Sequence, residues 1–224
     1  MPSRARAALV RWLAVEPHER PAVAAGFGLF FMLFAGYYLL RPVRETLGIA
    51  AGVEHLQWLF SATFVTTLLA LPAFGWVAAR VPRARILPVV YGFFALNLVA
   101  FAAALAAAPE SVWLARAFYV WLSVFNLVVV SLAWSVLIDC FDREQATRVF
   151  GLAAAGASIG GLIGPLLAVG LVGRFGHPGL LALAALALLV AIGFAALLRH
   201  HGRPRDVGAA RPLGGNVLAG VHEV

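Results

Sequence analysis

Two arginines and a glutamate at the end of the first long apolar segment form the strongest candidate for a binding site. Arg41 and Arg44 are three residues apart, so they share one helix face if the helix continues past Pro42. Charge at membrane depth is costly unless it faces a protein interior or an aqueous cavity, and paired guanidinium groups suit a phosphate or a carboxylate. We therefore expect Arg41, Arg44 and Glu45 to bind an anion, with anchoring of the arginines at the lipid headgroups as the alternative.

A second candidate is a polar stripe in the apolar segment between residues 112 and 138. Its members recur at spacings of three, four and three, which places them on one face of a helix; they are Arg116, Tyr119, Ser123 and Asn126. A polar stripe in an otherwise apolar helix predicts the wall of a cavity. The alternative is that Ser123 and Asn126 only form hydrogen bonds to a neighbouring helix.

Membrane-spanning helices must position these candidates. Of the 224 residues, 62% are hydrophobic and 12% are charged, with a mean hydropathy of +0.92, whereas a soluble domain is about half apolar and a quarter charged. A span needs about 20 apolar residues, and six segments qualify: Pro21–Leu40, Leu56–Ala79, Ile86–Ala107, Val112–Ile138, Phe150–Val172 and Leu180–Leu198. We expect an all-α membrane protein of six transmembrane helices, surrounded by lipid.

The basic residues predict the orientation of the chain. All 17 are arginine, and most lie near the N-terminus, in the loops at 80–85 and 143–148, and near the C-terminus. The positive-inside rule therefore places both termini in the cytoplasm of a multi-pass protein of the inner (cytoplasmic) membrane. We divide the chain into a cytoplasmic segment 1–20 with a short interfacial helix, a six-helix bundle 21–198 and a cytoplasmic linker or truncated connector 199–224.

Composition and motifs also exclude several classes of function. The net charge of +7 is spread over loops, so we expect no nucleic-acid partner. The single cysteine, Cys140, excludes an internal disulfide and a cysteine-cluster metal site, and we expect no metal and no cofactor. There is no His-Glu-x-x-His motif and no pair of aspartates at membrane depth. We therefore expect no enzymatic activity.

The basic turn between the second and third predicted helices resembles the loop motif of the major facilitator superfamily. Gly75, Arg80 and Arg83 match that motif, whereas Ala79 replaces its acidic residue and Pro82 replaces its second glycine. The resemblance implies that Arg83 pairs with an acidic residue at the end of the fourth helix, either Asp139 or Asp142, and so takes part in gating. Positive-inside topology alone is the alternative explanation of this loop.

Three glycines on the fifth predicted helix indicate close helix packing. Gly156, Gly160 and Gly164 recur every four residues and are followed by Pro165. Such spacing lets another backbone approach closely, and the proline allows a kink. The segment also resembles the glycine-proline motif of facilitator-superfamily antiporters.

The first helix carries a narrower resemblance. The segment Phe30–Leu47, with Tyr38, Leu40-Arg41 and Arg44-Glu45, resembles the corresponding segment of bacterial and plastid ATP/ADP translocases. Together the resemblances imply the N-terminal half of a twelve-helix secondary transporter, which moves a small anionic solute by alternating access. They favour an exchanger of a nucleotide or a phosphorylated compound.

Two other hypotheses stay open at the level of sequence. The cavity must be completed by a partner, which is either a missing C-terminal half of six helices or a second copy of this chain in a homodimeric half-transporter. We expect the former, and so expect the chain to be a fragment or a truncated product. A membrane scaffold or receptor without transport activity is the third class, because polar stripes also build protein interfaces.

Overall fold

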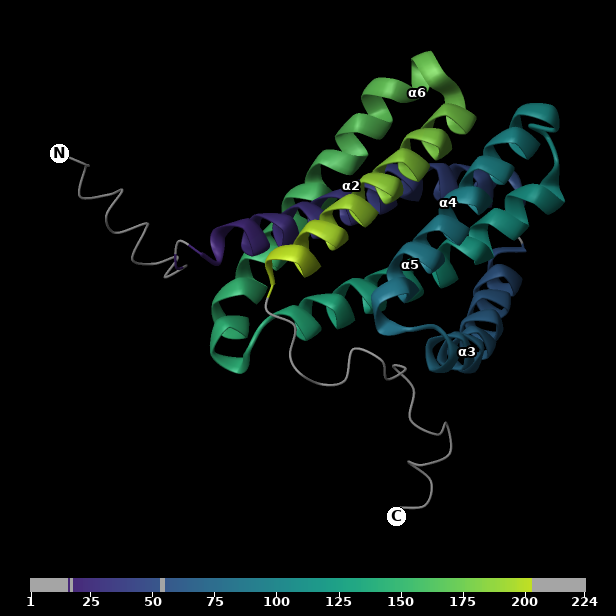
Figure 1. Cartoon of the computed structure of the whole chain (residues 1–224). Coiled ribbons are helices and arrows are strands. Elements are labelled where there is room, and N and C mark those ends of the chain that lie inside the picture. The colour runs from purple at the N-terminus through teal and green to yellow at the C-terminus, as the bar shows by residue number, and fades with distance from the viewer. Residues whose placement is uncertain (1–15, 17, 53–54, 203–224) are drawn as a thin grey trace.

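The computed structural model describes residues 16, 18–52 and 55–202, and this part of the chain is helical throughout its regular structure. It contains five helices, shown in Figure 1: α2 Arg20–Ala50, α3 Leu56–Arg80, α4 Arg83–Ala107, α5 Val112–Cys140 and α6 Arg143–His201. All five are long and apolar enough to cross a membrane. The chain is therefore an all-α membrane protein. Most of the predicted segments 1–20 and 199–224 lies outside the described residues.

The longest helix, α6, is broken at one glycine. Gly176 has φ +62° and ψ −176°, a backbone conformation outside the helical region. Residues other than glycine rarely adopt it. Figure 1 shows the two arms of α6 running side by side in opposite directions. The segments Phe150–Val172 and Leu180–Leu198, which we predicted as separate spans, lie on different arms. Pro165 does not interrupt the first arm, since the helix continues through it.

The first helix extends beyond the predicted apolar span, which ends at Leu40. It continues through Pro42 to Ala50, although proline removes one backbone donor from the helix. The Thr46 hydroxyl donates to the Pro42 carbonyl at 2.9 Å on the next turn. Because the helix continues past Pro42, Arg41 and Arg44 lie near the same face of α2, as predicted from their spacing.

Contact between α2 and the first arm of α6 is made backbone to backbone. A Cβ atom on Gly156, Gly160 or Gly164 would lie 2.5, 2.4 or 2.7 Å from a backbone oxygen of α2, which is closer than real Cβ atoms approach. The two helices have the most extensive contact of any pair in the described structure. The two backbones thus approach each other at the glycines whose spacing predicted close packing.

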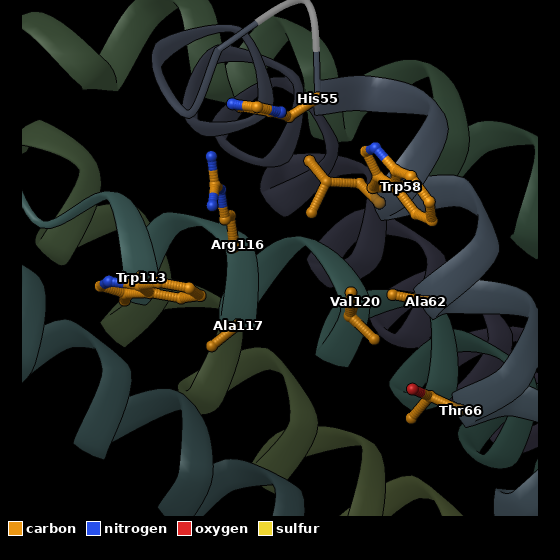
Figure 2. A pocket seen from close by; sticks show the side chains of 9 residues that line it. His55, Trp58, Ala62, Thr66, Trp113, Arg116, Ala117 and Val120 are labelled. Atoms are coloured by element: carbon orange, nitrogen blue, oxygen red, sulfur yellow. The ribbon is translucent and has the colours of Figure 1, made fainter.

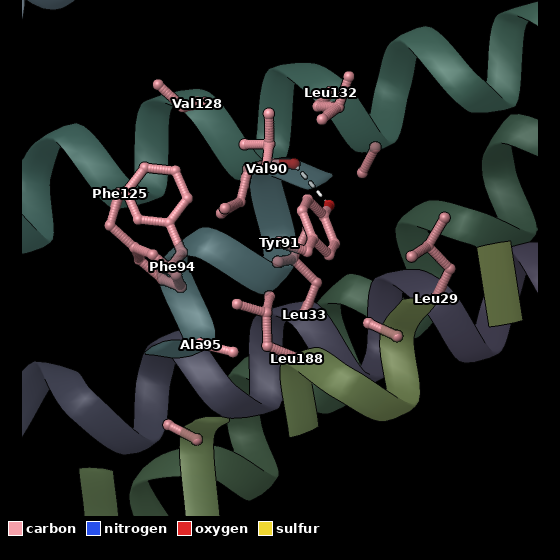
Figure 3. Close-up of a cluster of buried hydrophobic side chains, with 14 of the residues drawn as sticks. Leu29, Leu33, Val90, Tyr91, Phe94, Ala95, Phe125, Val128, Leu132 and Leu188 are labelled. Atoms are coloured by element: carbon pink, nitrogen blue, oxygen red, sulfur yellow. Dashed lines mark hydrogen bonds between the residues drawn. The ribbon is translucent and has the colours of Figure 1, made fainter. Parts of the chain in front are cut away.

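A buried layer between α2, α4, α5 and the second arm of α6 forms the core (Figure 3). Tyr91 on α4 is fully buried, and its hydroxyl donates to the Val129 carbonyl of α5 at 2.7 Å. Leu29 and Leu33 of α2 and Leu188 of α6 lie around it. The hydrogen bond satisfies the one polar group of the Tyr91 side chain in an apolar environment.

Helix α3 stands apart from this core. Only 6% of the residues in its most apolar 18-residue stretch are buried. Its main contact within the described residues is with α5. It exposes large side chains such as Trp58, Phe60 and Phe64. A single helix with so much exposed apolar surface must face lipid or another protein segment.

The glycine contact gives a first prediction. Gly160→Ala should lower the free energy of unfolding by about 1–3 kcal/mol, the usual cost of overpacking, because the new methyl group would meet the Phe31 carbonyl oxygen. Gly170→Ala is the matched control, since nothing lies within 4 Å of its added carbon and alanine favours the helix. Melting temperatures of the purified proteins in detergent check this. Equal melting temperatures for both variants and the parent would contradict the packing.

Candidate functional site

Arg44 is held between α2 and α5 and is not free to move. Its Nε donates to the Tyr119 carbonyl oxygen at 3.2 Å, and its guanidinium carbon lies 3.9 Å from the centre of the Tyr119 ring. Its Nη1 lies 3.2 Å from Glu45 Oε1, and 17% of its side chain is exposed. A cation over an aromatic ring is attracted by the ring's electrons. Arg44 and Tyr119 thus connect the C-terminal part of α2 to the N-terminal part of α5, with Glu45 beside Arg44.

Tyr119 is buried by the same contact. Its relative exposure is 2%, and a Cβ atom on Gly48 would lie 2.8 Å from its ring. The Phe60 ring of α3 meets it edge-on, with 6.3 Å between centroids. The residues of the predicted stripe on α5 therefore do not share one environment. Tyr119 packs between α2 and α3 and lines none of the described pockets.

Arg116 lines the largest of the described pockets, between α3 and α5. This pocket has a volume of about 470 Å³. Figure 2 shows the Arg116 side chain extending toward His55, with Trp113 on α5 and Trp58 on α3 to either side. The guanidinium carbon lies 5.2 Å from the centre of the Trp113 ring. Cationic and aromatic groups are thus combined in one cavity.

The hydrogen bonds of Arg116 orient its guanidinium group but do not use all of its donors. Nη2 donates to the Ala51 carbonyl oxygen at 3.1 Å. Nε is buried and has no hydrogen-bond partner within the described part of the chain. A buried donor without an acceptor is unfavourable, so the packing around Arg116 leaves one polar group of its side chain unsatisfied.

Arg41 lies on the exposed side of α2. Its guanidinium carbon is 5.7 Å from the centre of the Tyr38 ring, and the residue is exposed. Ser123 and Asn126 on α5 are half-buried, and neither lines a described pocket. The structure thus brings Arg44, Glu45 and Tyr119 together and places Arg116 and Arg41 on surfaces open to a ligand.

The predicted gating residues gather at the opposite end of the bundle. Arg83 Nη1 lies 3.2 Å from Asp139 Oδ1, one of the two acidic partners that the sequence offered. Arg199, at the end of α6, donates to the Arg83 carbonyl oxygen at 2.8 Å and to that of Ala84. The ends of α4, α5 and α6 are therefore connected through arginine side chains. A role in gating stays a prediction.

The remaining members of that set have local contacts. Asp142 is the N-cap of α6, and its backbone N–H donates to Gln145 Oε1 at 3.1 Å. The Gln145 amide in turn donates to the buried Glu19 carboxylate at 2.7 Å. Arg80 folds over the ring of Trp76 on its own helix, at 3.8 Å. A Cβ atom added to Gly75 would meet nothing within 4 Å.

Sequence reasoning missed the aromatic residues that accompany these charges. His55, Trp58 and Trp113 line the Arg116 pocket, and Phe34 lines another pocket beside α2. Phe27, Phe31, Phe34, Tyr38 and Arg41 recur at spacings of four, three, four and three, a one-face pattern that could have revealed the stripe on α2.

One hydrolase-like pattern in the sequence has the wrong structure for catalysis. Residues 156–160 read Gly-Ala-Ser-Ile-Gly, which matches the Gly-x-Ser-x-Gly pattern of a nucleophile elbow. Such a serine stands on a sharp turn between a strand and a helix. Ser158 instead lies within α6, and its hydroxyl donates to the Ala154 carbonyl oxygen at 3.0 Å. Among the described residues there is also no group of three His, Cys, Asp or Glu side chains that could hold a metal.

The family of the chain follows from comparison with known proteins. The family model described as Major Facilitator Superfamily matches residues 20–219. The chain belongs to the major facilitator superfamily. No curated protein and no solved structure matches it significantly. Membership supports secondary transport, in a multi-pass protein that contacts both lipid and solute, and it extends neither to a substrate nor to the ATP/ADP translocases.

The different environments of the two arginines on α2 give a second prediction. Arg44→Ala should lower the free energy of unfolding by about 1–2 kcal/mol, because a cation–π contact and a hydrogen bond between helices are lost. Arg41→Ala, at an exposed position, should leave the melting temperature unchanged. Thermal unfolding of both variants in detergent tests this difference. A larger loss for Arg41→Ala than for Arg44→Ala would show that the two roles are reversed.

Proposed function

We propose that this chain is a transporter half that moves a small organic or phosphorylated anion across an inner (cytoplasmic) membrane by alternating access. The observation that carries the proposal is Arg116, whose guanidinium group lines a cavity of about 470 Å³ between α3 and α5. Its buried Nε has no partner within the described residues. A guanidinium group in a low-dielectric pocket favours an anionic ligand strongly.

Arg41 is the second contact that we assign to the solute. It is exposed on α2 and stands over an aromatic ring, so its charge is available to a ligand. We assign a structural role instead to Arg44, Glu45 and Tyr119, which hold α2 against α5. This contact fixes the position of α2, and therefore of Arg41. Ser123 and Asn126 stay candidates for a deeper position of the solute along α5.

The exposed helix α3 supports the proposal that a second six-helix body completes the cavity. We propose that the two arms of α6 serve as separate spans, which gives six crossings and both termini on the cytoplasmic side. The completing body is a C-terminal half or a second copy of this chain. Rocking of the two bodies would expose the solute to each side of the membrane in turn.

The connected ends of α4, α5 and α6 supply an element that such rocking could open and close. The Arg83–Asp139 pair and the hydrogen bonds from Arg199 hold one end of the bundle together. The pair is partly exposed, so its strength depends on water access. We propose that this end is cytoplasmic and that its contacts are strongest in one of the two transport states.

The charges also favour exchange over proton coupling. Helices α3 and α4 contain no acidic residue, and Glu45 and Asp139 lie near the ends of α2 and α5. Proton-coupled carriers use ionisable groups within the membrane. We therefore propose antiport or facilitated diffusion of the anion, without covalent chemistry, and phosphorylated compounds such as nucleotides are the first substrates to test.

The third prediction tests the anion contact by uptake. With the complete transporter, this half together with the body that completes it, reconstituted in liposomes, Arg116→Gln should reduce the initial uptake of a labelled anionic substrate at subsaturating concentration by about tenfold or more, the usual effect of losing a charged hydrogen bond. Arg41→Gln should also reduce it.

The matched control for this uptake experiment is Arg174→Gln. Arg174 is an exposed arginine of α6 that lines none of the described pockets. Its replacement should leave uptake unchanged. Full uptake by both Arg116→Gln and Arg41→Gln would overturn the site, and the absence of saturable uptake of any anion would overturn the transport proposal.

A further inference from the structure

Four aromatic rings and one arginine lie along one partly exposed face of α2. Phe27 and Phe31 are stacked with 6.3 Å between centroids, and so are Phe34 and Tyr38. The Arg41 guanidinium carbon continues the series 5.7 Å from the Tyr38 centroid. The rings are half-buried, whereas Arg41 is exposed. Aromatic surface thus leads directly to a positive charge.

A pocket opens beside this stripe at Phe34 and Tyr38. It has a volume of about 300 Å³, and the first arm of α6 supplies its other wall through Ala157, Ser158 and Gly161. A Cβ atom on Gly161 would lie 3.2 Å from Tyr38 Cε2, so a larger residue there would push against the Tyr38 ring. The pocket is therefore narrow and bounded by ring surfaces on the α2 side.

The polar groups of the pocket are suited to orientation of a ligand. The Ser158 hydroxyl uses its hydrogen to bond the Ala154 carbonyl, which leaves its oxygen able to accept a hydrogen bond. The Arg41 guanidinium at the end of the stripe is a donor only. A ligand with a planar ring at Phe34 and Tyr38 would place a substituent of negative charge within reach of Arg41.

We infer that the pocket between α2 and α6 binds a planar, unsaturated ring of an organic anion, whose carboxylate or phosphate group is bound by Arg41. The inference rests on the proposed function and names the class of its substrate. Planar rings stack on aromatic side chains better than saturated rings of similar size do, because their faces and edges carry complementary charge. The volume lies at the small end of ligand sites, which fits a ring of the size of benzene with one substituent.

A lipid chain is the other apolar occupant available to such a surface, and the pocket matches it poorly. An acyl chain offers neither a planar face to Phe34 and Tyr38 nor an acceptor to Arg41. At this pocket, ring surface on α2 lies next to one cation, Arg41.

The experiment measures binding of four probes to the full chain in lipid nanodiscs by titration calorimetry. The aromatic probes are benzoate and phenyl phosphate, and the saturated probes are cyclohexanecarboxylate and cyclohexyl phosphate. We expect the aromatic member of each pair to bind about threefold to tenfold more tightly. Comparison between the pairs shows whether Arg41 prefers a carboxylate or a phosphate.

Variants assign the effect to the pocket. Phe34→Leu and Tyr38→Leu keep apolar bulk but remove the rings, so they should abolish the preference for the aromatic probe. Arg41→Gln should weaken all four probes. Phe64→Leu, on the exposed face of α3, is the matched control and should behave as the parent does. Melting temperatures verify that each variant is folded.

The outcomes separate this inference from the proposed function. Equal binding of aromatic and saturated probes, or a preference that survives in Phe34→Leu and Tyr38→Leu, overturns the ring pocket and leaves anion transport intact. Absence of binding by all four probes also overturns it. Anion transport is then decided independently by the dependence of uptake on Arg116, which lies in a different pocket.

Discussion

The close backbone contact between α2 and the first arm of α6 is the constraint on which the rest of the structure depends. Lipid is as apolar as the helices, so burial of apolar side chains cannot by itself hold a bundle together, and close van der Waals packing must do so. Gly156, Gly160 and Gly164 allow this approach because any side chain there would collide with backbone oxygens of α2. One side of α2 is thereby fixed against α6, and the stripe that runs from Phe27 to Arg41 lies beside this contact.

Fixing α2 determines what its charges can do. Arg44 is drawn into the contact with Tyr119 and becomes structural, whereas Arg41, on the exposed face, keeps its charge available. Arg116 on α5 resembles Arg41, because its charge is also available, but it lines a different pocket. At the other end of the bundle, Arg83 and Arg199 connect the helix ends to one another. Arginine thus serves three purposes in this protein, and neighbouring residues decide which.

Much of the fold could be predicted from the sequence, because apolar length and glycine spacing act locally. The spans and the packing face of α6 are examples. The apolar segment ends at Leu40, and only tertiary contacts such as that of Arg44 with Tyr119 show how the charged turns of α2 beyond it are held. The site was harder for the same reason. Spacing grouped Tyr119 with Arg116, but it could not show that α2 covers the former and leaves the latter accessible.

The central claim is that the stripe on α2 faces an aqueous cleft and not lipid. It can be tested with single cysteines in a Cys140→Ala background, in native membranes, with a charged thiol reagent. Thiols react as thiolates, which require water. The account predicts labelling of Phe34→Cys and Arg41→Cys, and no labelling of buried Leu33→Cys or of Leu96→Cys, at an exposed position of α4 that we place toward lipid. Phe34→Cys as unreactive as Leu96→Cys would contradict it.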